Sequence, residues 1–472
     1  MELLFIFLTL WLLEGMDDGE KSDLVTNEEN YVVIISIDGF PSSLLWDRLA
    51  PIPTIRSLAR DGAWSIGMRS TNPTLTWPNH TTLVTGVDAS KHHVLYNGKL
   101  EKRAEGIPVS VNPRQDKTDL TNAETIYDAA FKAGLKTAEV NWPVTRNAGT
   151  LHDSFPDVPD NVGHMTPDLL WEIYEEGILE DMTTFALWQH SSPGRDAVWV
   201  STAIHLIHNR MPNLLLLHLL HVDNTHHRIG LNTKPGYSAL ALSDYMVKDI
   251  LAALDSAGVR DRTTIFIVSD HGFTATSKTI LPNVILANAG FLELSEDDRI
   301  VGGKAQAVAN GGFASIYLSD PNDAESAELI KKLFEGQEGI HLVITPEEYS
   351  EHGLPHPSQT SQIGELVLFS EPGYGMSGSL QGELPVVSSA EYGFSLGHHG
   401  FHADFSQMNA VFVASGYGIK KGVELDLINN ISVAPTAAYL LGIDLPDADG
   451  EPLKEILDHD LLKKLSAATE VN

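Results

Sequence analysis

The stretch YVVIISIDG, residues 31–39, decides the fold class of this 472-residue chain. Its first seven residues, Tyr31–Ile37, are continuously apolar and rich in β-branched side chains, which is typical of a strand covered on both faces. Asp38 follows the strand directly, and open α/β sheets bind their ligands at the carboxyl ends of strands. A single aspartate in that place is more often a turn residue or a helix cap, so whether Asp38 belongs to a ligand site has to be judged from the rest of the chain.

The same buried-strand pattern recurs along the chain, with amphipathic helical stretches between the strands. Further strands are expected at residues 136–140, 213–220, 263–269 and 409–414, and helices at 54–62, 123–134 and 238–257. This alternation predicts an α/β protein whose central sheet is largely parallel and flanked by helices.

One stretch interrupts the alternation. Residues 305–318, 323–335, 341–349 and 364–369 predict the order strand, helix, strand, strand, so we expect a small α+β insertion at about residues 300–385. Length alone suggests about three domains. However, the chain has no internal repeat and no linker rich enough to separate folding units. We therefore expect one large domain over residues 29–465 that contains the insertion.

The N-terminus carries an 11-residue apolar run, Leu3–Leu13. It is too short to span a bilayer and suits the apolar region of a secretory signal. Glu2 stands where a positive charge is expected, and no small-x-small cleavage pattern follows, so a true start at Met16 is the alternative. We expect residues 1–28 to be a signal segment and polar leader, the protein to be secreted or periplasmic, and no helix to span a membrane.

Charge and cysteine content exclude several classes of function. Asp and Glu number 63 against 31 Lys and Arg, a formal net charge of −32, which disfavours nucleic-acid duplexes and anionic membranes as partners. The chain has no cysteine, which excludes disulfides, thiol catalysis and sulfur-ligated metals. A metal would need His, Asp, Glu or hydroxyl ligands, and the chain has 20 histidines.

Two further aspartates follow buried strands, and both lie close to histidines. Asp223, with His226 and His227 after it, follows the strand at 213–220, and Asp270-His271 follows the strand at 263–269. Three aspartates at strand ends favour a shared site over three separate caps. Carboxylate and imidazole ligands without sulfur suit zinc or a similar divalent cation.

Two more segments carry chemistry. The segment PTLTWPNHTTLVTG, residues 73–86, places Thr76 just before an expected proline-started helix. A hydroxyl there lies in the positive field of the helix N-terminus, which stabilises an alkoxide, although a simple N-cap gives the same pattern. Threonine is a weak nucleophile unless a base or metal lowers its pKa. The segment GHHGF, residues 397–401, is consistent with a tight loop that carries His399 into a site.

In this order the five motifs resemble the nucleotide pyrophosphatase/phosphodiesterase family of the alkaline phosphatase superfamily. The resemblance covers roughly residues 30–460 and implies an alkaline-phosphatase-like catalytic domain with two zinc ions. One ion would be held by Asp38, Asp270, His271 and the Thr76 oxygen, and the other by Asp223, His227 and His399.

The resemblance also implies roles for side chains beside the metals. Thr76 would be the nucleophile and would form a covalent phosphothreonine intermediate. Asn97 matches the family asparagine that hydrogen-bonds a phosphoryl oxygen, and Trp77 would contact the substrate, with a packed tryptophan as the plainer alternative. The family usually has glycine where this chain has His226, and His227 is assigned as the ligand because its spacing to Gly230 matches.

The function expected is therefore metal-dependent hydrolysis of phosphodiester or pyrophosphate bonds in a small-molecule substrate, nucleotide or lipid-derived. Two divalent cations on three aspartates leave a local charge of about +1, so the acidic surface does not exclude an anionic substrate. A phosphomonoesterase on the same scaffold is the alternative, because a monoester dianion usually needs Arg or Lys and Arg146 lies near Trp142-Pro143. A non-catalytic metal-bearing protein is the second alternative.

Three patterns have simpler explanations. His205 and His208 lie three apart without a third ligand, which predicts a solvated helix face. Asn79-His80-Thr81 and Asn430-Ile431-Ser432 fit the glycosylation pattern, but a glycan on the first would obstruct the Thr76 motif.

Overall fold

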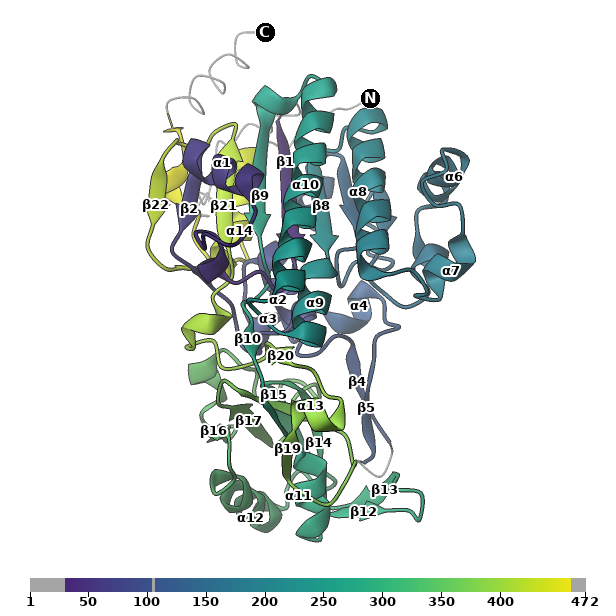
Figure 1. Ribbon diagram of the computed structural model, residues 1–472, viewed down its shortest axis with the longest axis vertical. Coiled ribbons are helices and arrows are strands. Elements are labelled where there is room, and N and C mark those ends of the chain that lie inside the picture. The colour runs from purple at the N-terminus through teal and green to yellow at the C-terminus, as the bar shows by residue number, and fades with distance from the viewer. Residues whose placement is uncertain (1–29, 104–106, 460–472) are drawn as a thin grey trace, which may run out of the picture.

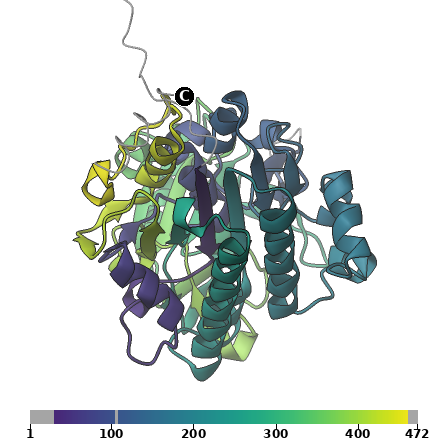
Figure 2. The same ribbon diagram turned by 90° about the horizontal axis from the view of Figure 1, so that it is seen from above.

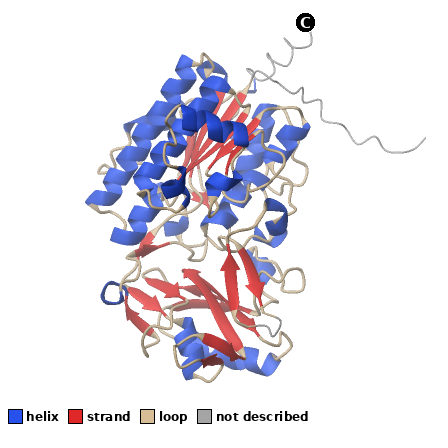
Figure 3. Cartoon of the chain, turned by 90° about the vertical axis from the view of Figure 1, so that its right-hand side faces the viewer, coloured by secondary structure: helices blue, strands red, loops and turns tan. Residues whose placement is uncertain are grey.

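The computed structural model describes residues 30–103 and 107–459 (Figure 1). The predicted signal segment and leader at residues 1–28 lies outside the described residues. Two sheets follow one another along the long axis of the molecule, a helix-covered one above and a second one below, as Figures 1 and 3 show.

The upper sheet has eight strands in the order β22-β2-β21-β9-β1-β8-β6-β7. Five of its seven pairings are parallel, and only the two made by β21 are antiparallel. The α/β fold with a largely parallel central sheet is therefore confirmed. Its strands are β1 (Tyr31–Ile37), β2 (Ala63–Ser65), β6 (Thr137–Val140), β7 (Asp153–Phe155), β8 (Leu214–Leu219), β9 (Thr263–Val268), β21 (Phe412–Gly416) and β22 (Val423–Leu425).

Helices cover both faces of this sheet, which explains the continuous apolar runs of its central strands. Alternate residues of β1 face opposite cores: Val33 and Ile35 pack with one set of helices, and Val32 and Ile34 with the other. Figure 2 shows α8 and α10 together on one side of the strands. The first set is α1 (Pro53–Asp61), α8 (Ser192–Asn209) and α10 (Lys234–Ser256); the second is α2 (Thr76–Thr85), α5 (Ile126–Lys132) and α14 (Val433–Leu441).

The lower sheet has seven strands in the order β16-β17-β15-β14-β18-β11-β19. Two of its strands lie outside the residues expected for the insertion, and the division of the chain into a catalytic domain with an insertion stays a prediction. The strands are β11 (Lys278–Ile280), β14 (Ala305–Gly311), β15 (Phe313–Leu318), β16 (Ile340–Ile344), β17 (Leu366–Ser370), β18 (Tyr374–Ser377) and β19 (Val386–Ser388).

The single strand expected at residues 305–318 is a hairpin of two antiparallel strands. The chain reverses at Gly311, whose φ of 63° lies in the left-handed region that favours glycine. A Cβ on Gly311 would lie 2.2 Å from the carbonyl oxygen of His399, so a side chain there would push the lower sheet away from the GHHGF loop.

Shorter elements connect the two sheets and complete the fold. They are α3 (Ala89–His92), α4 (Lys117–Leu120), α6 (Pro167–Glu175), α7 (Met182–Ala186), α9 (His221–Ile229), α11 (Pro282–Asn288), α12 (Ala324–Glu335), α13 (Ser389–Tyr392), β3 (Met68–Arg69), β4 (Lys99–Lys102), β5 (Val109–Asn112), β10 (Thr274–Ala275), β12 (Leu292–Leu294), β13 (Ile300–Gly303), β20 (Gly397–His398) and β23 (Ile428–Asn429). Over residues 30–103 and 107–459, none of the helices is both long and apolar enough to cross a membrane.

The structure also settles the three simpler patterns. His208 is exposed, as predicted, but His205 is buried in α8 and hydrogen-bonds the carboxylates of Glu172 and Glu176, so its predicted solvated position is wrong. The asparagines of both glycosylation patterns, Asn79 and Asn430, are fully buried, and the Asn430 amide donates to the Asn79 side-chain oxygen at 2.8 Å. A glycan has no room at either position.

Candidate active site

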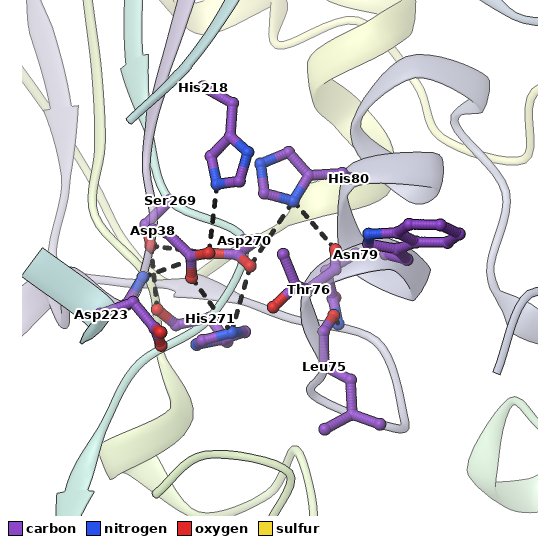
Figure 4. Close-up of polar contacts among 12 residues, drawn as sticks. Asp38, Leu75, Thr76, Asn79, His80, His218, Asp223, Ser269, Asp270 and His271 are labelled. Carbon is purple, nitrogen blue, oxygen red and sulfur yellow. Dashed lines mark hydrogen bonds and ion pairs between the residues drawn. The ribbon is translucent and has the colours of Figure 1, made fainter. Parts of the chain in front are cut away.

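Three aspartates meet at the carboxyl ends of the three central strands of the upper sheet (Figure 4). Asp38 follows β1, and Asp270 lies two residues after the end of β9. Asp223 lies in the first turn of α9, a helix that begins soon after β8 ends. The sequence-predicted convergence of these strand ends is therefore what the fold produces.

Asp38, Asp270 and His271 form a group that we call the inner cluster. The His271 Nε2 atom lies 3.4 Å from Asp38 Oδ1 and 3.1 Å from Asp270 Oδ2. All three side chains are at most 1% exposed. The other ring nitrogen of His271 donates to the Gly272 carbonyl at 3.0 Å, so the Nε2 lone pair points toward the two carboxylates.

Asp223, His227 and His399 form a second group, which we call the rim cluster. Asp223 Oδ1 lies 3.4 Å from His227 Nε2 and 3.8 Å from His399 Nε2. His227 Nδ1 donates to the Gly397 carbonyl, and His399 Nδ1 donates to the Thr74 carbonyl, both at 2.9 Å. These backbone contacts fix both rings with their Nε2 lone pairs toward the carboxylate.

The two histidine pairs of the sequence are distinguished by these contacts. His226 turns away from the rim cluster and its Nδ1 donates to the Gly39 carbonyl at 3.2 Å. His398 packs edge-on against His227, with ring centroids 5.1 Å apart. The geometry therefore favours His227 and His399 over their neighbours as ligands.

Gly39 allows the two clusters to approach one another. Its φ is +63°, and a Cβ there would lie 3.1 Å from both the Cα and the Cβ of Asp223. Its backbone N–H donates to Asp270 Oδ1 at 3.3 Å. Glycine at this position thus lets the strand-end loops that carry Asp38, Asp223 and Asp270 pack together.

The donor set of this site fits divalent cations. Among the described residues, two groups have ligand atoms within 4.8 Å of one another: the rim cluster, and Asp38, Asp223 and His271. Asp223 can thus reach both positions, and Asp270 contacts His271 beside the second. Within residues 30–103 and 107–459, four buried ligand atoms of the site have no hydrogen-bond partner: Asp38 Oδ1, Asp223 Oδ1, Asp270 Oδ2 and His271 Nε2.

Burial dominates the electrostatics of the site. It raises the pKa of Asp38 well above its ordinary value, and the Asp223 charge raises it further. Burial likewise raises the pKa of Asp270, with Asp38 as the next cause. Burial lowers the pKa of His271 to about 3, which keeps that imidazole neutral and able to bind a metal. The carboxylates thus ionise together only at a cost that a bound cation would offset.

Thr76 is the first residue of α2, so the helix begins two residues earlier than its Pro78 indicated. Figure 4 shows its side chain facing the inner cluster. The residue is 8% exposed and lies at the positive end of a ten-residue helix. This position suits a hydroxyl that must approach both the cluster and an anionic group.

Asn97 and Trp77 lie beside Thr76. The Asn97 side-chain oxygen accepts from the Trp77 backbone N–H at 3.0 Å, and no hydrogen bond of the Asn97 amide nitrogen is found among the described residues. The Trp77 side chain is 4% exposed and packs in an apolar cluster with Val94, Val144 and Val158. Its indole N–H donates to Asp157 at 3.1 Å, so the plainer interpretation of a packed tryptophan fits the geometry.

Two buried histidines next to the inner cluster were missed by sequence reasoning. His218, in β8, lies 3.1 Å from Asp38 Oδ2, and His80, in α2, lies 3.5 Å from Asp270 Oδ2. A signal for His218 existed, because an imidazole inside the apolar run LLLLHL requires a polar partner. His80 lies four residues after Thr76, on the same face of its helix.

Comparison with known proteins gives consistent matches. Residues 32–402 match the family described as Type I phosphodiesterase / nucleotide pyrophosphatase. Human ectonucleotide pyrophosphatase/phosphodiesterase family member 1 is 24% identical over 87% of this chain, and the venom phosphodiesterase of Naja atra is 22% identical over 90%. The chain spans only 40% and 46% of the lengths of these two relatives.

A solved structure supports the fold. Murine ectonucleotide pyrophosphatase/phosphodiesterase 5, an inactive variant in complex with AMP, superposes with a TM-score of 0.67 at 18% identity. The match covers 91% of this chain and 100% of that one. At this identity the likeness shows that the two chains share a fold.

Proposed function

The chain belongs to the type I phosphodiesterase / nucleotide pyrophosphatase family, and on that premise we propose that it is a metal-dependent hydrolase of phosphodiester or pyrophosphate bonds. The observation that carries the proposal is the convergence of the inner and rim clusters on one strand edge, with the Thr76 side chain facing the inner cluster (Figure 4). Nucleophile, cation ligands and helix N-terminus are then within reach of one phosphorus atom.

Two zinc ions are the proposed cofactors. Asp38, Asp270, His271 and Thr76 would hold one ion, and the rim cluster would hold the other, with Asp223 close to both. Oxygen and nitrogen donors without sulfur suit zinc, and the four unpartnered ligand atoms support occupancy by cations. Bound divalent cations would neutralise the substrate oxygens and lower the pKa of a nearby hydroxyl.

The side chains of the chain itself supply attack and orientation. Thr76 Oγ1 would attack phosphorus and form a phosphothreonine intermediate as the leaving group departs, and water would then cleave that ester. The N-terminus of α2 would stabilise negative charge on the threonine oxygen and on the phosphoryl group. The side-chain amide nitrogen of Asn97, whose oxygen is held by the Trp77 N–H, would donate a hydrogen bond to a phosphoryl oxygen.

The contacts of Arg146 favour a diester over a monoester. A monoester dianion carries an additional charge that usually needs Arg or Lys, and Arg146 was the candidate. Its Nε instead lies 2.5 Å from Asp116 Oδ1, in an ion pair of its own. Among the described residues, the ion-pair partners of Asp38, Asp223 and Asp270 are all histidines.

A small nucleotide is the substrate class that the relatives support. The solved murine relative is in complex with AMP, and the curated relatives are named as nucleotide pyrophosphatases or phosphodiesterases. The name ectonucleotide pyrophosphatase/phosphodiesterase also supports an extracellular location. The catalytic unit would be the domain over residues 29–465, with the insertion at about 300–385 beside its site.

The test compares bis-p-nitrophenyl phosphate with p-nitrophenyl phosphate, and a nucleoside triphosphate with its monophosphate. The purified full chain is expected to hydrolyse the aryl diester at least tenfold faster than the monoester, and to release a nucleoside monophosphate from the triphosphate. Removal of metal by a chelator should abolish both activities, and zinc should restore them.

Two results would contradict the proposal. A preference for the monoester would support the phosphomonoesterase alternative. Zinc binding without hydrolysis of either ester class would support a non-catalytic metal-bearing protein.

A further inference from the structure

His218 is a polar residue in an otherwise apolar, buried strand. It lies in β8, whose six residues LLLLHL are all buried, and β8 is flanked by β1 and β6 at the centre of the upper sheet. Its side chain is 1% exposed. Burial of an imidazole costs free energy unless its nitrogens are hydrogen-bonded, so the contacts of this ring need an account.

Asn141 fixes one end of the ring. The Asn141 carbonyl oxygen lies 2.9 Å from His218 Nδ1, and the Asn141 side-chain amide nitrogen lies 3.3 Å from the same atom. The same amide donates to the His218 backbone carbonyl at 3.2 Å. Asn141 adopts a left-handed backbone with φ of 60°, which asparagine tolerates better than most residues. His218 Nδ1 can donate to the carbonyl oxygen or accept from the amide nitrogen, but not both at once, and in either case Asn141 holds this end of the ring.

The other end of the ring faces the inner cluster. His218 Nε2 lies 3.1 Å from Asp38 Oδ2, and because a carboxylate only accepts, the proton of this hydrogen bond is on Nε2. The second oxygen, Asp38 Oδ1, lies 3.4 Å from His271 Nε2 and has no hydrogen-bond partner in the part of the chain that the structure describes. One carboxylate oxygen is therefore engaged by His218 while the other faces the unpartnered nitrogen of a candidate ligand.

Packing restricts the ring further. The His218 and His80 rings lie 4.3 Å apart between centroids, and His80 packs edge-on against the buried Trp142 at 4.9 Å. The His80 Nδ1 donates to the Thr76 carbonyl at 2.9 Å. The His218 ring, which hydrogen-bonds Asp38, therefore also packs against the His80 ring, which hydrogen-bonds the carbonyl of the first residue of α2.

We propose that His218 is a positioning residue, which orients Asp38 so that only Oδ1 is presented to the cation of the inner cluster. The inference rests on the proposed function, since it concerns the metal that function requires. Hydrogen-bonded partners of metal ligands typically contribute about 10- to 100-fold in metal affinity. His218 would make that contribution without touching metal or substrate.

The experiment measures zinc affinity of the full-length protein rather than its activity. Metal-free protein is titrated with zinc against a competing chromogenic chelator, for the unsubstituted chain and for His218→Leu and His218→Gln. Leucine matches the neighbouring residues of β8 but has no donor. Glutamine places an amide nitrogen where Nε2 stood. H218L should bind one of two zinc equivalents about 10- to 100-fold more weakly, and H218Q should lie within about threefold of the unsubstituted chain.

His205 provides a matched control. It is equally buried, with a side chain 2% exposed, and hydrogen-bonds the carboxylates of Glu172 and Glu176 at 2.9 and 2.8 Å. It belongs to neither cluster. His205→Leu should lower the melting temperature and leave both zinc affinities unchanged, which separates loss of a buried hydrogen bond from loss of metal positioning.

The outcomes are distinguishable. Unchanged zinc binding in H218L would overturn this inference and leave the proposed function intact. If zinc affinity falls equally in H218L and H218Q, the effect comes from loss of the ring shape, and the proposal that His218 positions Asp38 through a hydrogen bond is wrong. If the unsubstituted chain binds no zinc, the metal premise of the proposed function fails together with this inference. If H218L does not fold, His218→Asn, which can meet Asn141 but is too short to reach Asp38, takes its place with the same expected loss.

Discussion

The inner and rim clusters use similar residues in different surroundings. The inner cluster is at most 1% exposed and has two carboxylates around one imidazole. The rim cluster has one carboxylate between two imidazoles, and its His227 side chain is 24% exposed. In the inner cluster, charges are confined away from water and next to one another. In the rim cluster, the single carboxylate lies between two imidazoles, one of which reaches solvent.

The inner cluster therefore depends more on a bound cation than the rim cluster does. Burial raises the pKa values of both inner carboxyl groups, and a neighbouring carboxylate raises each pKa further: Asp223 acts on Asp38, and Asp38 acts on Asp270. A cation there would therefore offset an electrostatic cost as well as form bonds. Burial raises the pKa of Asp223 as well, but the next causes, His227 and His218, lower it, whereas a neighbouring carboxylate adds to the rise for each inner carboxyl group. We expect substitutions in the inner cluster to change both stability and turnover, and substitutions in the rim cluster to change mainly zinc binding.

The largest expected effect comes from Thr76→Ala. The variant keeps every carboxylate and imidazole of both clusters but removes the proposed nucleophile. We expect turnover of a diester substrate to fall by about 10³-fold or more, with zinc content retained. The measurement is steady-state hydrolysis together with metal analysis of the same preparation.

Thr85→Ala is the matched control for that variant. Thr85 lies in the same helix, and its hydroxyl donates to the Thr81 carbonyl at 2.8 Å. Its turnover should stay within about threefold of the unsubstituted chain, because such a change costs only about 1 kcal/mol of stability. Retained full activity in T76A would eliminate Thr76 as the nucleophile.

The second expected effect separates the clusters directly. Asp38→Asn should weaken zinc binding by about 100-fold and should not lower the stability of the metal-free protein, because it removes a charge that burial opposes. His227→Gln should weaken zinc binding by about 10-fold or more and leave metal-free stability within about 0.5 kcal/mol. Zinc titration and thermal unfolding of both variants check this.

A contrary pattern in these two variants would be informative. If D38N destabilises the metal-free protein more than H227Q does, the hydrogen bonds of Asp38 outweigh its buried charge. The inner cluster would then be held together without a cation, and the contrast between the clusters would fail.

The smallest expected effect is on the pH dependence of stability. An acid whose pKa is raised on folding contributes stability below its ordinary pKa, near 4, and that contribution is lost as pH rises toward the folded value. His271 acts in the opposite sense, because its pKa falls to about 3 and its contribution is lost as pH falls below the ordinary histidine value. Above about pH 6.5 the His271 ring is neutral in both the folded and the unfolded chain, so of these groups only the carboxyl groups still make stability depend on pH.

Metal-free protein should therefore lose stability as the pH rises above about 6.5, by about 1.4 kcal/mol per pH unit for each proton that the folded inner carboxyl groups still retain. Zinc should flatten this slope, and D38N should reduce it. Chemical unfolding at several pH values, with and without zinc, measures the slope. A metal-free slope that is flat or positive would mean that the inner carboxyl groups ionise freely in the folded state.

The sequence could predict most of the site because its signals are local. Asp38 and Asp270-His271 follow apolar strands, and the carboxyl ends of parallel strands meet at one edge. Asp223 and His227 lie four apart on one helix face. His399 depended on the resemblance, because no local rule predicts that residues 397–401 return to this edge. Whether these residues act as proposed stays a prediction.

His218 and its contact with Asp38 illustrate what could not be predicted. The contact requires β1 and β8 to be adjacent in the register that pairs Ser36 with His218, and strand order and register are non-local properties. The same limit applies to the lower sheet. The strand expected over residues 305–318 ignored Gly311-Gly312, a turn signal that was present in the sequence but was outweighed by the apolar residues around it.

The hydrogen bond between Thr74 and His399 limits when the site can form during translation. The Thr74 carbonyl accepts from both His399 Nδ1 and the Gly400 N–H, and the Thr74 hydroxyl donates to the Phe401 carbonyl at 2.8 Å. The segment that leads to Thr76 is made early during translation, and the loop that holds it is made late. A nascent chain that has not yet emerged beyond Phe401 lacks both the second rim imidazole and the anchor of this segment, so the site cannot form before residues 397–401 have left the ribosome.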